Sequence, residues 1–243
     1  MNLIVDAGNS FIKLAVFNNN KLISSLTLNY EVAISRTEKI LNDYPIKYSI
    51  VASTKQDQPQ LLQLLERSTK LHILSHKSEF PFKNNYKTPT TLGLDRLALV
   101  SAAIKEFPQK NCLIIDAGTC VTYDFIDRKK VYHGGAISPG LQMRFKAMHT
   151  FTDKLPLLTK QELNKDLIGN TTETSMQVGA LVGLVKEVDG FVTDYLSDYE
   201  DLTVILTGGD HQILSTRLKN SIFATSNFLV KGLNFILEYN KNS

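Results

Sequence analysis

Two short motifs in the sequence combine the residue types that bind phosphate groups and metal ions. Each one, Asp6-Ala7-Gly8 and Asp116-Ala117-Gly118, comes directly after an apolar stretch. A glycine lets the backbone approach a ligand closely, and successive N–H groups in a turn form a concavity that binds anions. The carboxylate can hold a metal ion beside the phosphates. Each motif is therefore a candidate phosphate-binding turn, although one copy alone is also typical of an ordinary turn after a strand.

The two motifs belong to an internal repeat. Residues 3–8 match residues 113–118 at an offset of 110 positions, with five of six residues identical. Each copy is followed by an apolar segment, a polar turn and a second apolar segment. An offset this long favours two domains of related fold over a solenoid, whose period is about 20–50 residues. The duplication favours the phosphate interpretation, in which two turns hold a nucleoside triphosphate across a cleft between the domains.

The elements that must position these turns alternate between strand-like and helix-like patterns, which predicts an α/β architecture. The patterns predict strands at residues 2–6, 11–17, 21–28, 48–52, 71–74 and 204–206, and helices near 61–65 and at 92–107, 172–198 and 229–239. Residues 134–140 contain three glycines and a proline and predict a loop. Gly179 and Gly183 indicate close helix packing within the long helix, whose valine stripe is either core or a subunit interface.

Two further candidates have ordinary explanations of equal or greater weight. Asp95 and Arg96 lie where a helix begins. Asp95 could be a general base and Arg96 a clamp for a substrate carboxylate. An acidic residue that complements the helix dipole and a solvated arginine are the simpler interpretation. The glycine pair in Thr207-Gly208-Gly209-Asp210 either lets a flat ring lie against the backbone or merely turns the chain.

Composition and missing motifs exclude several classes of function. The chain has 27 Lys and Arg against 24 Asp and Glu, an excess too small to indicate nucleic-acid binding. No apolar run is long enough to span a bilayer, and two cysteines without a CxxC spacing fit free thiols in a reducing compartment, so we expect a cytoplasmic protein. The sequence lacks Walker, GxGxxG, HExxH and GxSxG motifs. His72 and His76 have no third ligand nearby, which favours structural histidines over a metal site.

Taken together, the motifs resemble those of the type III pantothenate kinases, a family within the actin and sugar-kinase superfamily. The resemblance rests on six segments in order: Asp6-Ala7-Gly8-Asn9-Ser10 with Lys13, Tyr86 with Gly93-Leu94-Asp95-Arg96, Asp116-Ala117-Gly118-Thr119, residues 134–140 with Leu155-Pro156, Gly169-Asn170-Thr171 with Gly179, and Thr207-Gly208-Gly209-Asp210. They cover nearly the whole chain. The family's first motif usually ends in threonine, and Ser10 keeps its hydroxyl group.

The resemblance implies a fold and a reaction. The fold would be α/β, with two ribonuclease H-like domains of the actin and sugar-kinase superfamily, at residues 1–110 and 111–243, separated by an interdomain cleft. The reaction would be the ATP-dependent phosphorylation of pantothenate, the first step of coenzyme A synthesis. Asp95 would be the base that accepts the proton of the pantothenate hydroxyl group. The substrate would be held by Tyr86, Gly93, Leu94, Asp95, Arg96 and Thr171.

The resemblance also implies the cofactors and partners. ATP would be bound by Asp6, Ala7, Gly8, Asn9, Ser10, Phe11, Ile12, Lys13 and Thr119. Asp6 would hold Mg²⁺ with the ATP, Asp116 would bind a monovalent cation (K⁺ or NH₄⁺), and the protein would be a homodimer. Two alternatives remain: a non-catalytic nucleotide-binding regulator on the same fold, and a kinase for another small molecule. The intact Asp6, Lys13, Asp95 and Asp116 argue against the regulator, and Tyr86 argues for pantothenate.

Overall fold

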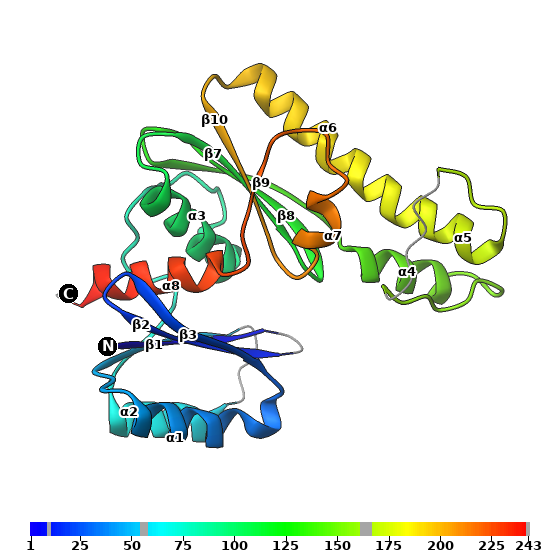
Figure 1. Cartoon of the computed structure of the whole chain (residues 1–243). Helices are drawn as coiled ribbons and strands as arrows, with labels where there is room; N and C mark the ends of the chain where they lie inside the picture. The colour runs from blue at the N-terminus through cyan, green and yellow to red at the C-terminus, as the bar shows by residue number, and fades with distance from the viewer. Residues whose placement is uncertain (9–10, 54–57, 161–166, 242–243) are drawn as a thin grey trace. The chain divides into compact units, whose positions relative to one another are not determined.

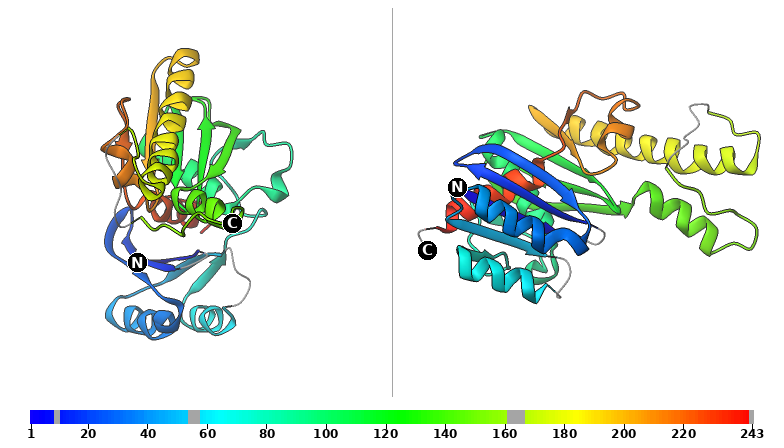
Figure 2. Two further views of the ribbon diagram at one scale, coloured as in Figure 1. Left: turned by 90° about the vertical axis from the view of Figure 1, so that its right-hand side faces the viewer. Right: turned by 60° about the horizontal axis from the view of Figure 1, so that its bottom comes forward.

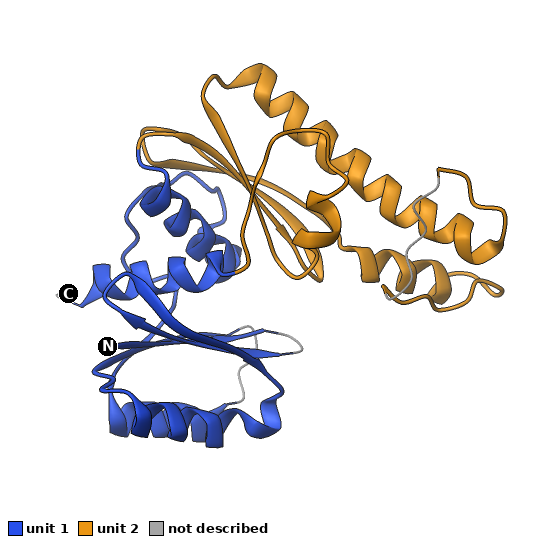
Figure 3. Cartoon of the chain, viewed as in Figure 1, with its two compact units in different colours: residues 1–108, 227–243 blue, residues 109–226 orange. Residues whose placement is uncertain are grey.

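The computed structural model of the chain describes residues 1–8, 11–53, 58–160 and 167–241. The chain divides into two compact units (Figure 3). Unit 1 comprises residues 1–108 and 227–243, and unit 2 comprises residues 109–226. The repeat predicted lobes of residues 1–110 and 111–243. The two divisions agree near residue 110 and differ at the end of the chain, where the last helix packs in unit 1. The boundaries of the two lobes that the repeat indicates, residues 1–110 and 111–243, therefore stay a prediction.

Unit 1 contains a mixed sheet with the strand order β3-β2-β1-β4-β5. Its strands are β1 (Asn2–Ala7), β2 (Ile12–Asn18), β3 (Lys21–Leu28), β4 (Tyr48–Ser53) and β5 (Lys70–Ile73). β1, β2 and β3 form an antiparallel meander, and β4 and β5 extend the sheet in parallel. The short strand β6 (Lys83–Asn84) belongs to the same unit. The predicted strands of this half are confirmed to within a few residues.

Helices cover both faces of this sheet (Figure 1). They are a 3-10 turn (Tyr30–Val32), α1 (Ala33–Asp43), α2 (Pro59–Ser68), a second 3-10 turn (Pro89–Thr91), α3 (Leu94–Glu106) and α8 (Phe228–Asn240). Side chains of a strand alternate between its faces. Leu3 and Val5 therefore pack with α1 and α2, whereas Ile4 packs with α3 and α8. Asp6 is two residues after Ile4 on the same strand, so its side chain lies on the face of the sheet that packs with α3.

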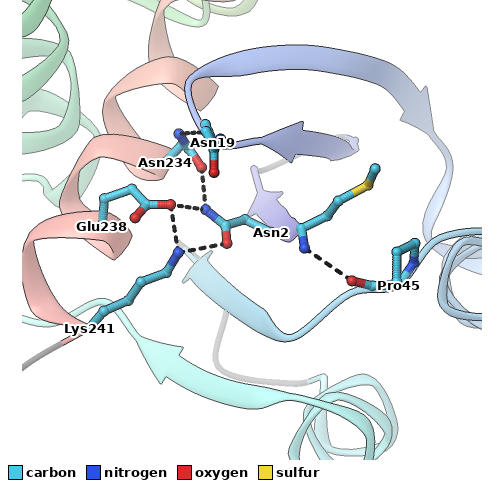
Figure 4. Close-up of polar contacts among 7 residues, drawn as sticks. Asn2, Asn19, Pro45, Asn234, Glu238 and Lys241 are labelled. Carbon is cyan, nitrogen blue, oxygen red and sulfur yellow. Dashed lines mark hydrogen bonds and ion pairs between the residues drawn. The ribbon is translucent and has the colours of Figure 1, made fainter.

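Polar contacts fasten α8 to the first strand of unit 1 (Figure 4). The buried Asn2 donates hydrogen bonds from Nδ2 to Asn234 Oδ1 (2.8 Å) and Glu238 Oε1 (2.6 Å). Lys241 Nζ donates to Asn2 Oδ1 (3.0 Å) and Glu238 Oε1 (2.6 Å). Beside this network Leu233 and its apolar neighbours pack against the sheet. This packing explains why α8 joins unit 1 although the sequence placed it in the second lobe.

Unit 2 repeats the topology of unit 1, with its strands in the order β11-β10-β7-β8-β9. β7, β8 and β9 form the antiparallel meander, and β10 and β11 extend it in parallel. The elements are β7 (Asn111–Ala117), β8 (Cys120–Ile126), β9 (Val131–Pro139), α4 (Leu141–Thr150), α5 (Thr172–Gln177), a π-helical turn (Val178–Val182), α6 (Gly183–Asp198), β10 (Leu202–Thr207), α7 (His211–Ser215) and β11 (Phe223–Ala224). The repeat seen in the sequence is therefore a repeat of fold. No helix in the described part of the chain is long and apolar enough to cross a membrane.

Two local expectations for unit 2 are wrong. Residues 134–139 continue strand β9 and are not a loop. The glycines permit a close strand pairing, because a Cβ at Gly135 would lie 1.7 Å from the Tyr123 carbonyl oxygen. Gly179 and Gly183 make no close packing contact within the described chain, since no atom beyond the neighbouring residues and the helix's own nearby backbone lies within 4 Å of a Cβ built on either residue. The valine stripe is core: Val185, with its apolar neighbours on α6, packs against the unit 2 sheet.

Candidate active site

The first candidate turn places a carboxylate and an ammonium group side by side. Asp6 on β1 pairs with Lys13 on β2 as direct neighbours in the antiparallel register. Directly opposite residues of such a pair have Cβ atoms about 4.5–5.5 Å apart on one face of the sheet. Both side chains are half-buried and lie on the face that packs with α3. Because side chains alternate along a strand, the Asp6 carboxylate and the Lys13 ammonium group both lie on the side of the sheet where α3, the helix that carries Asp95, packs.

Burial raises the pKa of Asp6 to about 6, well above the ordinary range of an aspartate. The positive charge of Lys13 lowers this pKa and the negative charge of Asp95 raises it, and both effects are smaller than that of burial. A carboxylate whose charge is poorly solvated gains most from a bound cation. Asp6 is thus suited to hold a metal ion.

The turn that follows Asp6 is held by its backbone. Gly8 N donates to the carbonyl oxygen of Phe11 (3.1 Å), and the carbonyl oxygen of Gly8 accepts a hydrogen bond from the Tyr30 hydroxyl. Asn9 and Ser10, both assigned to ATP in the sequence analysis, lie outside the described residues. Ala7 and Ile12 are buried, so only their backbone can face a ligand, whereas the Phe11 side chain is exposed.

The start of α3 holds the candidate base, Asp95, in a defined position. Asp95 Oδ1 accepts a hydrogen bond from the backbone N–H of Arg96 (2.8 Å). The same oxygen lies against Gly93, where a Cβ would approach it to 2.3 Å. Gly93 is therefore the residue that leaves room for the carboxylate. The charge of Asp95 acts on Asp6, so the two acidic groups belong to one site in unit 1.

Tyr86 and Arg96, the two residues expected to hold the substrate, are also together. The guanidinium carbon of Arg96 lies 5.8 Å from the centroid of the Tyr86 ring, within the range of a cation–π contact. Arg96 is 4% exposed, and Tyr86 is half-buried. The Tyr86 backbone N–H donates to Asn84 Oδ1 (2.9 Å), which fixes the chain at the aromatic residue.

In unit 2 the turn after Asp116 is held by the backbone of its own Gly118 and by Gly140, which comes from a later part of the sequence. Gly118 N donates to the Cys120 carbonyl oxygen (2.9 Å), and Gly140 N donates to the Thr119 carbonyl oxygen (3.1 Å). A Cβ at Gly140 would lie 2.2 Å from the carbonyl oxygen of Gly118. Thr119 itself is exposed, so its hydroxyl group and backbone are open to a ligand.

The Thr207-Gly208-Gly209-Asp210 segment closes on the same turn from the other side. Gly208 has φ +91°, and a Cβ there would lie 2.4 Å from both Asp116 Oδ1 and the Ala117 carbonyl oxygen. Asp210 N donates to Ala117 O (2.9 Å). The buried Asp210 carboxylate in turn binds Lys160 Nζ, at 2.6 Å from each oxygen. Three sequence motifs thus meet at one turn within unit 2.

Oxygen atoms gather around Asp116. In the register of the sheet its neighbours are Thr122 on β8 and Thr207 on β10. The hydroxyl oxygen of Thr122 is buried and has no hydrogen-bond partner among the described residues. Those residues contain no group of three or more His, Cys, Asp or Glu side chains that could form a metal site alone. A carboxylate with hydroxyl oxygens fits a hard cation that takes its other ligands from elsewhere.

Thr171 lies in a different part of unit 2. It caps the N-terminus of α5: its hydroxyl accepts from Thr174 N (3.2 Å), and Thr174 Oγ1 accepts from Thr171 N (2.9 Å). With Met148 and Leu155 it lines a shallow hollow. The helices α4 and α5 lie near each other in this part of unit 2 (Figure 2). The hydroxyl of Thr171 is exposed there and can contact a ligand.

The structure thus groups the candidate residues within each unit. Unit 1 brings together Asp6, Lys13 and Asp95, and pairs Tyr86 with Arg96. In unit 2 three motifs meet at the turn after Asp116, whereas Thr171 lies elsewhere, at the start of α5. The sequence analysis missed Tyr30 and Lys160. Each acts through a tertiary contact, with a backbone carbonyl or a buried carboxylate, and carries no motif that could have revealed it.

Comparisons with known proteins identify the family of this chain. A family model described as type III pantothenate kinase matches residues 2–194. A type III pantothenate kinase of Christiangramia forsetii is 51% identical, over 99% of this chain and 99% of its own length. A solved Campylobacter jejuni protein, described as a conserved Baf family transcriptional activator, has a TM-score of 0.61 at 21% identity and covers 99% of this chain and 100% of its own.

A glucokinase from an Antarctic psychrotroph aligns over 98% of both chains, with a TM-score of 0.53 at 12% identity. At such identities the solved structures show the fold alone. That fold is the α/β fold expected, with two related domains that are each built on a mixed sheet, and it is shared with this glucokinase. Because the family model covers most of the chain and the curated relative aligns along its whole length, the chain belongs to the type III pantothenate kinase family.

Proposed function

We propose that this protein catalyses the ATP-dependent phosphorylation of pantothenate to 4'-phosphopantothenate, the first step of coenzyme A synthesis. The observation that carries the proposal is the position of Asp95. Its carboxylate is held by a backbone N–H at the start of α3 and acts electrostatically on Asp6, the candidate metal ligand. A general base beside a phosphate-binding turn is the arrangement that phosphoryl transfer to an alcohol requires.

The nucleotide site is assigned to the turns that follow Asp6 and Asp116 in the two copies of the repeat. Residues 6–13 and Thr119 bind the ATP phosphates, with the Lys13 ammonium as a point charge. Asp6 holds Mg²⁺ together with the phosphate oxygens, since Mg²⁺ is usually bound by one or two carboxylates plus substrate phosphates. When bound, Mg²⁺ neutralises the charge that develops on the transferring group.

Asp116 is assigned to a monovalent cation, K⁺ or NH₄⁺. The assignment rests on the family resemblance and is supported by the unpaired hydroxyl oxygen of Thr122 next to Asp116 on the adjacent strand. Buried oxygen atoms without a partner are unusual, and a bound ion satisfies them.

Pantothenate is assigned to Tyr86, Gly93, Leu94, Arg96 and Thr171. Arg96 pairs with the substrate carboxylate, because a guanidinium group presents donors that match a carboxylate. Thr171 offers its hydroxyl group as a donor, since the same hydroxyl oxygen already accepts a hydrogen bond from Thr174 N.

The reaction is an in-line transfer. The oxygen of the pantothenate hydroxyl attacks the γ-phosphorus, its proton passes to the Asp95 carboxylate, and the bond from the γ-phosphorus to the bridging oxygen breaks as ADP leaves. Positioning supplies most of the rate, and a general base adds about 10²–10⁴-fold. The backbone N–H of Arg96 keeps the Asp95 carboxylate aligned for this proton transfer.

The protein is further proposed to be a cytoplasmic homodimer. Both cysteines are free thiols, which suits a reducing compartment. Unit 2 exposes Phe151, Leu157, Leu167 and Ile168, and its long helix has open space at Gly179 and Gly183. Exposed apolar side chains are typical of a surface that another subunit covers.

The test is an assay of ADP release with pantothenate and Mg-ATP, run in K⁺, in NH₄⁺ and in Na⁺ alone. Pantothenate-dependent turnover that requires K⁺ or NH₄⁺ supports both the kinase and the cation site. Folded protein that binds nucleotide but gives no turnover in any of these salts contradicts the kinase and favours the regulator. Turnover that is as fast in Na⁺ as in K⁺ contradicts the cation role of Asp116 and leaves the kinase assignment intact.

A further inference from the structure

His76 makes a hydrogen bond to the segment that carries the candidate base. Its Nε2 atom lies 2.8 Å from the carbonyl oxygen of Leu92, which directly precedes Gly93. A carbonyl oxygen only accepts, so the imidazole donates from Nε2. Leu92 is 2% exposed and is therefore an internal anchor of the Gly93-Leu94-Asp95-Arg96 segment.

The hydrogen bonds of α3 itself hold its start only weakly. No side chain caps the helix at Gly93, and the first helical hydrogen bond, from Leu97 N to Gly93 O, is 3.4 Å long. The Thr91 hydroxyl bonds back to Thr88, which holds only the preceding turn. The contact from His76 joins this helix start to another part of unit 1.

The turn that bears His76 is itself firmly held. Ser78 N donates to Ser75 O (3.0 Å), and Ser78 Oγ accepts from Ser75 N (3.1 Å). Asn240 on α8 brackets the next residue, because its side chain accepts from Glu79 N (2.9 Å) and donates to Glu79 O (2.9 Å). His76 therefore projects from a fixed support onto the less constrained helix start.

We propose that His76 is a positioning residue, which sets the place of the Gly93-Leu94-Asp95-Arg96 segment through the Leu92 carbonyl. This inference rests on the proposed function, since it assigns that segment to pantothenate and to the base. A shift at Leu92 moves Gly93, against which the Asp95 carboxylate packs. Small displacements of a reacting group cost a large factor in rate, because attack requires close and aligned approach.

The experiment compares His76→Leu, His76→Gln and the control His72→Leu. His72 is the matched control because its Nε2 atom also makes one hydrogen bond, which goes to Ser78 Oγ (2.9 Å) and not to the Leu92 carbonyl oxygen. We expect His76→Leu to raise KM for pantothenate about five- to tenfold and to lower kcat, while KM for ATP stays unchanged, as loss of one hydrogen bond implies. His76→Gln, which keeps an N–H donor, should restore most of the loss.

Amide hydrogen exchange at residues 94–97 provides a readout that needs no substrate. In His76→Leu these amides should exchange faster, and in His72→Leu they should exchange at the wild-type rate. Equal effects of the two leucine variants on pantothenate KM, or unchanged exchange at residues 94–97 in His76→Leu, would overturn the proposal. A wild-type protein without pantothenate-dependent turnover would refute the proposed function instead, and the exchange measurement would still decide whether His76 holds the segment.

Discussion

Asp6 and Lys13 are direct neighbours across β1 and β2, on the face of the unit 1 sheet that packs with α3. The second copy of the repeat pairs Asp116 with Thr122 at the equivalent strand position. The carboxylate is thus kept in both copies, and only the first copy has a cation opposite it. This difference matches the proposed roles of the two carboxylates, in which Asp6 holds Mg²⁺ with the ATP and Asp116 binds a monovalent cation.

The raised pKa of Asp6 predicts that Mg-ATP binding weakens as the pH falls through about 6, because a protonated carboxyl group does not bind Mg²⁺. It also predicts the effect on folding. Between pH 3.8 and about 6 the folded protein keeps a proton that the unfolded chain has released, so stability falls as the pH rises through this window. At higher pH the ionised Asp6 continues to destabilise the fold.

The variant Asp6→Asn removes that charge. At pH 7.5 we expect it to be more stable than the wild type by about 1 to 2 kcal/mol, or roughly 2–8 °C in Tm, after allowance for partial solvent screening. Mg-ATP binding should be lost at the same time. Thermal unfolding and calorimetric titration measure the two effects, with the exposed Asp43→Asn as the control. A lower Tm together with intact Mg-ATP binding would contradict the role of Asp6.

Asp95→Asn tests the general base. The amide cannot accept the hydroxyl proton, so turnover should fall by about 10²–10⁴-fold. Because Asp95 is assigned to the phosphate acceptor, the affinity for ATP should change little. The ADP-release assay measures the first effect and nucleotide titration the second. Turnover within a few-fold of the wild type would remove Asp95 from this role.

Gly93→Ala should impair catalysis without unfolding the protein. The new methyl group would lie 2.3 Å from Asp95 Oδ1, so the carboxylate turns away and loses its hydrogen bond to Arg96 N. The backbone at Gly93 suits alanine, since its φ is −57°. We expect kcat to fall at least tenfold with a Tm near that of the wild type. Gly190→Ala, which has open space in α6, is the control and should retain full activity. Unchanged kcat in Gly93→Ala would show that the carboxylate does not depend on this position.

The adjacent glycines Gly208 and Gly209 should respond oppositely to the same change. Gly208→Ala combines a positive φ with a methyl group 2.4 Å from the Ala117 carbonyl oxygen, so it should destabilise unit 2 and abolish nucleotide binding. Gly209→Ala meets no atom within 4 Å and should be tolerated. Circular dichroism melts and ADP titration compare the pair. Similar behaviour of the two variants would contradict the close approach of Gly208 to Ala117.

Arg96 predicts the selectivity for the acceptor. Pantothenol, which has a hydroxyl group in place of the carboxylate, should be a much poorer substrate than pantothenate because it cannot form the charged pair. The assay compares kcat/KM for the two compounds. Equal values would exclude a carboxylate contact for Arg96, and leave its contact with Tyr86 as its main role.

Local patterns predicted most of the fold. The meanders and the turns after Asp6 and Asp116 are encoded by short segments, and their repetition strengthened each assignment. Helix α1 was not predicted, because Thr37 interrupts its buried stripe; only in the structure does its hydroxyl bond back to Ala33 O (2.8 Å). Residues 134–139 were mistaken for a loop because strand pairing through glycine depends on the partner strand, here at Tyr123.

The site was predicted less completely than the fold. Asp95 and Arg96 gave no decisive signal by themselves, since acidic and basic residues are ordinary at a helix start. Their significance comes from the tertiary structure, which brings the charge of Asp95 near Asp6 and places Arg96 against Tyr86. His76 illustrates the same limit, because a lone histidine in a sequence does not reveal which carbonyl group it will hold.

The placement of α8 in unit 1 has a consequence for how the protein is made. The helix α8 is synthesised after all of unit 2, so the first sheet emerges from the ribosome without the helix that covers Ile4 and Ile50. Unit 2 is continuous in sequence and can complete its fold during translation, as domains generally do. Unit 1 must therefore wait with exposed apolar surface, and a chain that terminates before residue 227 would remain a substrate for chaperones and proteases.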